Sequence, residues 1–413
     1  MSELKKYKLG DLGFFFGGVT SIKPEDYGFG TPFLSYKNVY KNSKVNVNEL
    51  ELMNVRPQDV ERRSAIYGDI FFTASSETPD EVAMSSVLLD NVENLTFNGF
   101  CKRFRLNDFN TLLPEYARYL FRDISFRREV YQLATGDIRF NISQESLANI
   151  GIEIPDIPTQ KEIAQILTSL DDKIELNLQM NQTLEATAQA LFREWFVNFN
   201  FPGFDGELVD GLPKGWKVEN IGRIGKVITG TTPSSSTPEH FGDYLPFITP
   251  TDFKSYNKLI FSAARYLSDV GSYSLRNRIL PVNSVIVTCI GSDMGKVAIS
   301  KVECLTNQQI NSIVLSPSNS FTDYIYYNLV NRYDLLRNMA TGGSTMPIIN
   351  KTQFEGIEVI VPDSALLMKF QTLMDSFNNK IGQNIIQNQY LSQLRFSLLP
   401  KLMTGKIEVK SNN

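Results

Sequence analysis

The sequence predicts an α+β protein in which two mixed α/β domains are separated by two long antiparallel coiled-coil helices, related by a pseudo-twofold internal repeat. Two observations lead to this fold class. The second half of the chain repeats the first, and a repeat of this length shows that one architecture has been used twice. Each half also ends in a long segment with the apolar periodicity of a single helix.

The repeat is clearest at two prolines. Ile152–Pro155 matches Val359–Pro362 at a shift of 207 residues (362 − 155). The part before these segments matches less closely and its shift drifts, which indicates insertions in loops. Each half is therefore predicted to be a variable domain followed by a more regular segment.

Short strands and a helix are expected in each variable domain. Residues 67–73 and 283–288 are apolar runs that follow turn residues, which is typical of buried strands. Residues 114–121 predict a helix that begins near a proline, and residues 321–337 are its counterpart in the second half.

The two regular segments predict long helices. Residues 159–195 contain neither Gly nor Pro, and their apolar residues recur at alternating steps of three and four, which is a heptad seam. Thr159 and Glu162 resemble a capping box at the start of this helix. Residues 364–399 repeat the seam, and their single Gly382 should cost about 1 kcal/mol of helix stability.

Asparagines interrupt both seams, and such residues fix the register of paired helices at some cost in stability. If the helices are antiparallel and Asn181 faces Asn384, the residue numbers of each facing pair sum to 565. Almost all of the other pairs that result are apolar on both sides, and only Leu170 with Arg395 is mixed. A parallel pairing would also align the asparagines, but the second domain begins where the first helix ends, which favours the antiparallel one. The residues expected to pair are Leu167, Leu170, Ile174, Asn177, Asn181, Leu184, Ala188, Leu191, Met374, Phe377, Ile381, Asn384, Asn388, Leu391 and Leu398.

The chain is thereby divided into five parts. We expect a first variable domain at 1–157, a long helix at 158–200, a second variable domain at 201–363, a second long helix at 364–403 and a C-terminal tail at 404–413.

This order of variable domains and long helices resembles that of the specificity (S) subunit of type I restriction–modification systems. The most telling segments are 191–199 after the first helix, 398–407 after the second, and the turn at 230–233. The resemblance implies that each variable domain is a target recognition domain that reads one half of a bipartite, asymmetric double-stranded DNA target in host defence. It also implies that the long helices space the domains and dock two modification (methyltransferase) subunits, and that restriction subunits join through the complex.

No catalytic motif is found, so we expect a non-catalytic subunit of a restriction/adenine-methyltransferase complex, without a cofactor. The single histidine and three dispersed cysteines give no metal-binding spacing. The formal net charge of −4 argues against binding DNA alone through bulk electrostatics. Because no apolar run could span a membrane and no secretory signal is found, a cytoplasmic protein with no membrane partner is expected. The alternative is a restriction enzyme or methyltransferase fragment with fused recognition domains.

Candidate DNA contacts are cations, amides and hydroxyls in loops, because these groups read base edges and phosphates. For each one the alternative is a solvated surface charge or a polar group that caps a turn. Arg139 and Lys296 are favoured, since neighbouring glycines allow the backbone to approach a phosphate closely. The candidates are Lys37, Asn38, Lys41, Lys44, Arg62, Arg63, Arg139 and Asn141 in the first domain, and Thr249, Lys254, Lys258, Arg276, Arg278, Lys296, Ser344 and Thr345 in the second.

Overall fold

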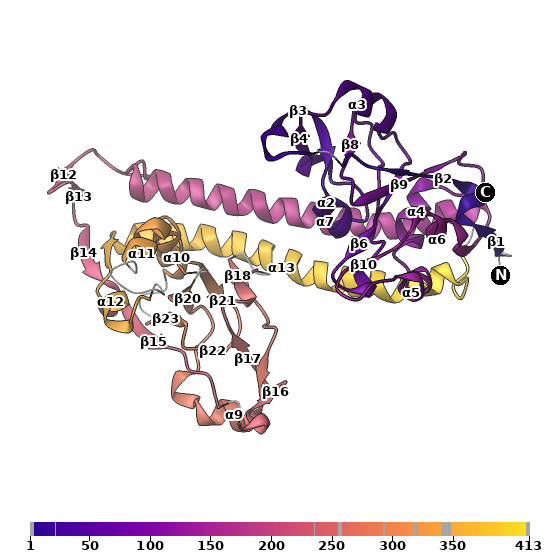
Figure 1. Ribbon diagram of the computed structural model, residues 1–413. Coiled ribbons are helices and arrows are strands. Elements are labelled where there is room, and N and C mark those ends of the chain that lie inside the picture. The colour runs from indigo at the N-terminus through magenta and orange to yellow at the C-terminus, as the bar shows by residue number, and fades with distance from the viewer. Residues whose placement is uncertain are drawn as a thin grey trace. The chain divides into compact units, whose positions relative to one another are not determined.

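The computed structural model of the chain describes residues 4–20, 22–234, 236–254, 258–291, 294–316, 321–339 and 348–409 (Figure 1). It divides into two compact units. Unit 1 comprises Met1–Leu176 with Gln387–Asn413, and unit 2 comprises Asn177–Ile386. The division therefore falls within the two long helices, and each helix contributes a segment to both units.

Unit 1 consists of short strands and short helices around segments of the long helices. Its strands are β1 (Lys5–Lys8), β2 (Gly13–Gly17), β3 (Tyr27–Leu34), β4 (Glu51–Met53), β5 (Ile70–Thr73), β6 (Ser75–Ser76), β7 (Ser85–Val87), β8 (Thr96–Phe97), β9 (Cys101–Leu106), β10 (Phe140–Asn141) and β11 (Gly151–Ile154). Its helices are α1 (Leu9–Leu12), α2 (Tyr36–Lys41), α3 (Pro57–Arg63), α4 (Pro114–Leu120), α5 (Ile124–Leu133) and α6 (Gln144–Asn149). The helix α7 (Ile157–Phe192) begins in this unit and α13 (Ser364–Met403) ends in it.

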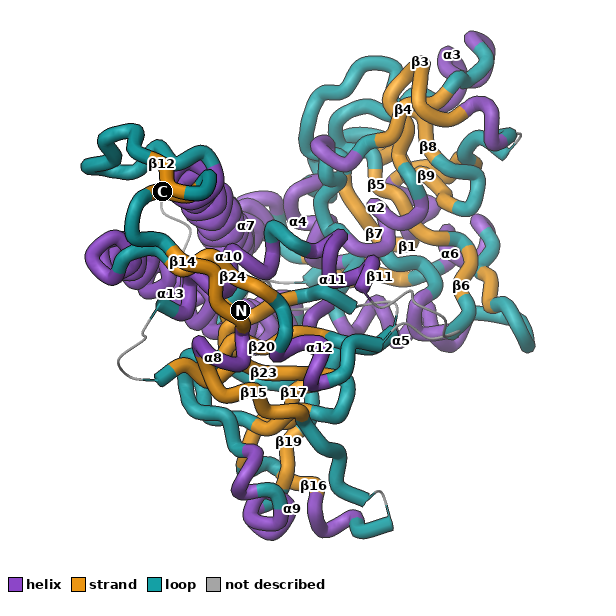
Figure 2. Tube along the Cα trace, turned by 90° about the vertical axis from the view of Figure 1, so that its left-hand side faces the viewer, coloured by secondary structure: helices purple, strands orange, loops and turns teal. Residues whose placement is uncertain are grey.

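The main core of unit 1 lies beside the antiparallel sheet β2–β9–β5–β7. Figure 2 shows β5, β7 and β9 of this sheet. The predicted strand at 67–73 is β5, and all four of its residues are buried. Phe72 of this strand packs in one cluster with Tyr116 of α4, Phe126 of α5 and Leu167 of α7. This apolar cluster joins the sheet to the long helices. A second sheet has the order β4–β3–β8, and two-stranded pairs are formed by β1 with β11 and by β6 with β10.

Unit 2 repeats this plan with larger sheets. Its strands are β12 (Leu208–Val209), β13 (Leu212–Pro213), β14 (Lys217–Asn220), β15 (Gly225–Thr229), β16 (Phe241–Gly242), β17 (Leu245–Ile248), β18 (Leu259–Ile260), β19 (Tyr266–Leu267), β20 (Val285–Thr288), β21 (Val297–Ser300), β22 (Leu305–Thr306), β23 (Ile310–Leu315) and β24 (Glu358–Val361). Its helices are α8 (Ile221–Ile224), α9 (Asp269–Ser274), α10 (Thr322–Val330), α11 (Tyr333–Met339) and α12 (Lys351–Glu355), with the end of α7 and the start of α13. The two main sheets have the orders β15–β23–β20–β21–β18 and β16–β19–β17–β22.

One predicted helix in unit 2 is wrong in its extent. The segment 321–337 forms two helices, α10 and α11, with a break at Asn331 and Arg332. The side-chain amide of Asn331 donates to the carbonyl of Tyr327 at 2.9 Å. The backbone N–H of Asn331 donates to the same carbonyl at 3.0 Å. Asn331 therefore caps the end of α10 with both its backbone and its side chain, and the chain turns there.

The long helices run antiparallel within each unit. In unit 2, Asn384 donates its Nδ2–H to Oδ1 of Asn181 at 2.8 Å, and the rings of Trp195 and Phe370 lie 6.1 Å apart. Both contacts join residues whose numbers sum to 565. In unit 1, Asn388 donates to the carbonyl of Ile174 at 3.2 Å.

Most of the residues expected to pair are buried or half-buried. Ala188, Met374 and Ile381 belong to the core of unit 2, with Leu184, Leu191 and Phe377 packed against it. In unit 1, Leu167 lies in the main core and Leu398 packs against it, while Leu170 and Leu391 are half-buried. Asn177 is buried. Arg395, expected opposite Leu170, makes an ion pair with the neighbouring Asp171.

Two details of the long helices differ from expectation. α7 begins at Ile157, and Oδ1 of Asp156 accepts the Thr159 backbone N–H at 3.1 Å, so the cap is Asp156 and not Thr159. On α13, Gly382 lies against Phe261, and a Cβ at this position would be 3.0 Å from the ring. The glycine that weakens the helix therefore allows the domain of unit 2 to approach it closely.

Candidate nucleic-acid interface

The first group of candidate residues lies on α2 in unit 1. Lys37 and Lys41 are exposed, one helical turn apart. Asn38, between them, is buried: its Nδ2–H donates to the carbonyl of Asn46 at 2.9 Å, and its Oδ1 accepts the Asn46 backbone N–H at 3.1 Å. The expectation that Asn38 contacts DNA is therefore wrong, because this amide is fully used in holding the turn after the helix.

The basic residues of α3 have two different roles. Arg62 is exposed to solvent. Arg63 pairs with Asp59 at 3.1 Å and donates to the carbonyls of Gly17 and Gly18 at 2.6 and 2.8 Å. Arg63 thus connects α3 to the end of β2, and these contacts use most of its guanidinium N–H groups. Elsewhere, the half-exposed Lys44 forms an ion pair with Asp90 at 3.0 Å.

Arg139 lies at the tip of a closed loop between α5 and α6. The loop is closed by Thr135 and Asn141, which exchange backbone hydrogen bonds of 3.0 and 2.9 Å. Gly136 has a φ of +141°, and a Cβ there would be 2.2 Å from the carbonyl oxygen of Arg139. Asn141 also donates its Nδ2–H to the Arg139 carbonyl at 3.1 Å. Asn141 therefore helps to position Arg139, and glycine is required for the turn.

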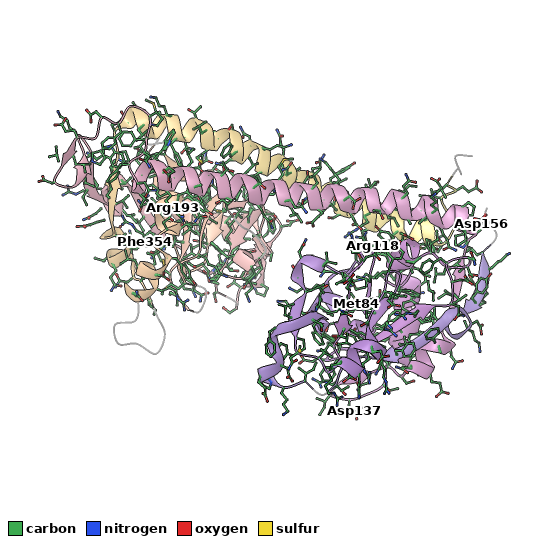
Figure 3. All side chains as sticks on the ribbon, turned by 90° about the horizontal axis from the view of Figure 1, so that it is seen from above. Met84, Arg118, Asp137, Asp156, Arg193 and Phe354 are labelled. Carbon is green, nitrogen blue, oxygen red and sulfur yellow. The ribbon has the colours of Figure 1, made fainter. Side chains whose placement is uncertain are left out.

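A hollow of about 460 Å³ opens beside this loop. One wall is β6, which pairs with β10, and another is α2. The hollow is lined by Tyr36, Tyr40, Ser75, Ser76, Glu77, Glu81, Phe100 and Arg139. Figure 3 shows Asp137, in the same loop as Arg139, at the end of the domain away from α7, whereas Arg118 lies against that helix. The loop is therefore presented on the side of the domain opposite its attachment to the helices.

The floor of the hollow is ordered by hydrogen bonds to Glu81. Tyr40 donates to Oε1 at 2.6 Å and Ser76 to Oε2 at 2.8 Å. These bonds stabilise the carboxylate and hold the pKa of Glu81 below its ordinary value, while the pKa of Tyr40 is raised by the same bond. Burial raises the pKa of Tyr36, whose hydroxyl donates to the Ser75 carbonyl at 2.7 Å. At neutral pH the hollow thus contains a fixed negative charge and two neutral phenols.

Candidates in unit 2 are more dispersed. Thr249 is committed to a turn, since its N–H and its hydroxyl both donate to Oδ2 of Asp252, at 2.8 and 3.0 Å. Arg276 stacks over the Tyr273 ring at 4.7 Å, and Arg278 donates to the Thr229 carbonyl at 2.5 Å. Lys254 is exposed and Lys296 is half-buried next to β21. Ser344 and Thr345 lie outside the described residues.

Lys258 is not a surface residue, and its assignment as a DNA contact is wrong. Its side chain is 2% exposed, and its Nζ lies 2.5 Å from Oδ1 of Asp323. It also donates to the Tyr327 hydroxyl at 2.8 Å, and that hydroxyl donates to Glu185 of α7 at 3.1 Å. Asp323 further accepts from Asn378 of α13 at 2.9 and 3.0 Å. This network attaches the domain of unit 2 to both long helices.

A corresponding network attaches the domain of unit 1. Asp171 of α7 pairs with Arg118 of α4 at 2.7 Å and accepts from the Tyr119 hydroxyl at 2.8 Å. Arg395 of α13 pairs with the same carboxylate. Both networks were missed in the sequence, because their members are distant from one another along the chain and belong to no motif.

Within the part of the chain that the structure describes, no group of three or more His, Cys, Asp and Glu side chains could hold a metal ion. The three cysteines are free thiols and are buried, and burial raises their pKa values. A search of the described residues finds no helix that is both long and apolar enough to span a membrane.

Comparison with known proteins identifies two matching regions. Residues 1–186 and 213–392 match the family model of the type I restriction modification DNA specificity domain. The specificity subunit of the type I restriction enzyme HindI of Haemophilus influenzae is 29% identical over 484 aligned residues, covering 98% of this chain and 100% of that protein. The MjaIX specificity subunit of Methanocaldococcus jannaschii is 23% identical, covering 99% of this chain and 94% of the relative.

Among solved structures, the S subunit of a type I restriction–modification system from M. genitalium is similar with a TM-score of 0.63. The match covers 97% of this chain and 96% of that one, at 13% sequence identity. At this identity the likeness is one of fold, and it extends over both units.

Proposed function

The chain belongs to the family of type I restriction–modification DNA specificity subunits, and from this premise we propose that it reads a bipartite, asymmetric DNA target, one half with each domain. The observation that carries this proposal is that each repeat separately matches the family domain. Each repeat supplies one domain of short strands, attached by a buried polar network to an antiparallel helix pair. Because the two domains differ in sequence, the two half-sites are expected to differ as well.

The long helices are proposed to act as the spacer. α7 and α13 are continuous helices, and each contributes to both units. In DNA-binding proteins of other classes, fixed separation of two recognition elements sets the spacing between half-sites. We propose the same relation here, with the helix length setting the number of base pairs between the two half-sites.

The chemistry is assigned to partners. As a specificity subunit this protein is a DNA-recognition component, and we propose that two modification subunits dock on the helix pairs and supply the adenine methyltransferase activity, with restriction subunits joining the complex. The internal repeat supports a complex with two modification subunits, since similar surfaces in the two units can bind two copies of one partner. Such a complex would act in the cytoplasm, where chromosomal DNA is found.

A domain exchange tests this proposal. Residues 201–363 would be replaced by the corresponding part of another specificity subunit, and genomic methylation would be mapped in a host that carries the complete system. The expected result is a new sequence in one half of the methylated target, with the other half and the spacing unchanged. A change in both halves would contradict independent reading. Co-purification of the modification subunits with the exchanged chain shows whether assembly has been preserved.

The docking part of the proposal has its own test. Leu184→Pro places a proline in the interior of α7, which costs about 3 kcal/mol or more. We expect this variant to lose the modification subunits in size-exclusion chromatography with light scattering, while Leu208→Pro in the exposed strand β12 retains them. Retention of both modification subunits by Leu184→Pro would contradict the role of the helices.

A further inference from the structure

We propose that the hollow of unit 1 reads a G·C base pair in the half-site of the first domain, with Arg139 donating to guanine and Glu77 accepting from cytosine. This inference rests on the proposed function and deepens it, because it names the base pair and the two side chains that specify it. Four features of the hollow support it: its position, its fixed floor, the two uncommitted charges at its rim and the lysines beside it.

The position of the hollow suits contact with a large ligand. It is formed beside the loop that contains Asp137 and Arg139, at the end of the domain away from α7 (Figure 3). Ile138, between these residues, is 90% exposed. The tip of this closed loop is therefore fully accessible to a large ligand.

The backbone of Arg139 is held in place before any ligand arrives. The Thr135–Asn141 backbone pair closes its loop, and the Asn141 amide binds the Arg139 carbonyl at 3.1 Å. Gly136 packs so closely on that carbonyl that no other residue fits. A side chain presented from a fixed backbone loses less conformational entropy on binding, which favours a specific contact.

Two charged groups at the rim have no partner within the described part of the chain. The Arg139 guanidinium and the Glu77 carboxylate each lack a hydrogen bond or ion pair there, although both line the same hollow. Glu81 differs, because Tyr40 and Ser76 occupy both of its oxygens. The Arg139 guanidinium can thus donate two parallel hydrogen bonds and the Glu77 carboxylate can accept one at the same site. The polar groups of Glu81 below them already have hydrogen-bond partners.

This combination matches the major-groove edge of a G·C pair. Guanine presents two acceptors, O6 and N7, which an arginine contacts in bidentate fashion, and cytosine presents the N4 amino donor, which a carboxylate accepts. An adenine is most often read by Asn or Gln, and neither residue type lines the hollow. The neighbouring Asn141 already donates to the Arg139 carbonyl. The chemistry of the lining therefore favours G·C over A·T.

The surface next to the hollow carries lysines that can contact the phosphates of the DNA backbone. Lys37 and Lys41 lie on α2, the same helix that contributes Tyr36 and Tyr40 to the wall. Both lysines are exposed. Contacts of lysine with phosphate position a protein on DNA without reading sequence, so these residues supply a matched control for the base-reading pair.

The test uses the full chain assembled with its modification subunits and a library of randomised DNA duplexes, from which bound sequences are selected and counted. Four proteins are compared: the wild type, Arg139→Ala, Glu77→Gln and Lys37→Gln. For the wild type we expect a two-part sequence with a G·C pair at one position of one half. Arg139→Ala and Glu77→Gln should each reduce the preference at that one position by about 10- to 100-fold, and leave the other half unchanged.

Lys37→Gln should weaken binding of all sequences to the same degree and alter no preference. The inference is overturned if Arg139→Ala and Glu77→Gln lower affinity evenly, leave every preference intact, or alter a position occupied by A·T. A wild-type selection without a two-part sequence would instead refute the proposed function, and the inference would fall with it. Thermal unfolding and co-purification of the modification subunits show that each variant is folded and assembled.

Discussion

Asn384 of α13 donates its side-chain N–H to Oδ1 of Asn181 of α7 at 2.8 Å, in a helix seam that is otherwise mainly apolar. Asn384 is almost fully buried. A buried amide without a partner costs more free energy than the bond itself contributes. The pair therefore penalises any register of the two helices in which the asparagines do not meet.

Replacing one asparagine should be more harmful than replacing both. Asn384→Leu leaves the Asn181 amide facing an apolar side chain, and we expect a loss of about 1–3 kcal/mol in the free energy of unfolding. The double variant Asn181→Leu, Asn384→Leu should be close to the wild type or more stable, since both polar groups are removed together. Urea unfolding of the four proteins gives the coupling energy as a double-mutant cycle. Strictly additive losses would show that the bond does not set the register.

The ion pair between Asp171 and Arg118 should be essential for the stability of unit 1. Their side chains are 9% and 11% exposed, and their nearest atoms are 2.7 Å apart. Asp171→Asn leaves the Arg118 cation buried without its charged partner, and a loss of about 3–5 kcal/mol is expected. The same substitution also removes the charged partner of Arg395.

A matched control is available in the exposed ion pair of Lys6 with Glu153, at 3.3 Å. Glu153→Gln should change the stability by less than about 1 kcal/mol, because exposed pairs are screened by solvent. Both variants would be measured by urea unfolding in the same buffer. If Asp171→Asn costs no more than Glu153→Gln, Asp171 does not anchor the domain.

Glu185 should make the stability of unit 2 depend on pH. Burial raises the pKa of Glu185, and the nearby Lys258 only partly offsets this effect. A carboxyl whose folded-state pKa is raised favours folding most below its unfolded pKa, and this contribution is lost as the pH rises through the folded pKa. Glu185→Gln cannot ionise, so its free energy of unfolding relative to the wild type should increase from pH 4.5 upward.

Asp323 supplies the opposite case. Burial alone would raise its pKa, but the charge and hydrogen bond of Lys258, with bonds from Asn378 and Gln371, hold it below the ordinary value. Its contribution is present above its unfolded pKa and is lost as the pH falls through the folded one. Asp323→Asn should therefore be destabilising at pH 7 and should not show the upward trend of Glu185→Gln. Parallel curves for the two variants between pH 4.5 and 8 would contradict these assignments.

Gly382 should not tolerate a large side chain. Leucine is a better helix former than glycine by about 1 kcal/mol, but at this position the side chain meets the Phe261 ring, because even a Cβ would lie 3.0 Å from it. Gly382→Leu should therefore lower the melting temperature, with an overpacking cost of about 1–3 kcal/mol. Gln383→Leu, at the exposed neighbouring position, should not. A more stable Gly382→Leu protein would mean that the domain can move away from α13.

The fold class could be predicted from the sequence because it follows from periodic patterns. The antiparallel direction of the helices could be predicted because the second domain begins where the first helix ends. Polar residues such as Asn181 and Asn384 can be satisfied in an apolar seam in few ways, so their spacing restricts the register. Trp195 and Phe370 then come together without further assumptions. The cap of α7 was wrongly assigned to Thr159 because the capping side chain, Asp156, stands before the periodic pattern begins.

The candidate interface was predicted less well, since composition does not show whether a polar side chain is already engaged. Lys258 resembles any other cation in a variable loop, and only the fold places Asp323 and Glu185 around it. Asn38 is similar, because its partner Asn46 lies across a turn whose geometry the sequence does not fix. Arg139 retains its candidacy, and the one available signal for the hollow beside it was the spacing of Tyr36 and Tyr40 on a single face of α2.

The two anchoring networks differ at equivalent positions of the long helices. In unit 1 the long helix provides the acid, Asp171, and the domain provides the cation, Arg118. The repeat counterpart of Asp171 is Asn378 (171 + 207), an amide that donates to an acid of its domain, Asp323. A domain transplanted alone from the second position to the first would thus bring Asp323, with its partner Lys258, against the carboxylate of Asp171 instead of an amide that donates to it. Recombination between such proteins is therefore restricted by these contacts. A domain can be exchanged for another from the same position, whereas its transfer to the other position requires that the contacting helix residue is transferred with it.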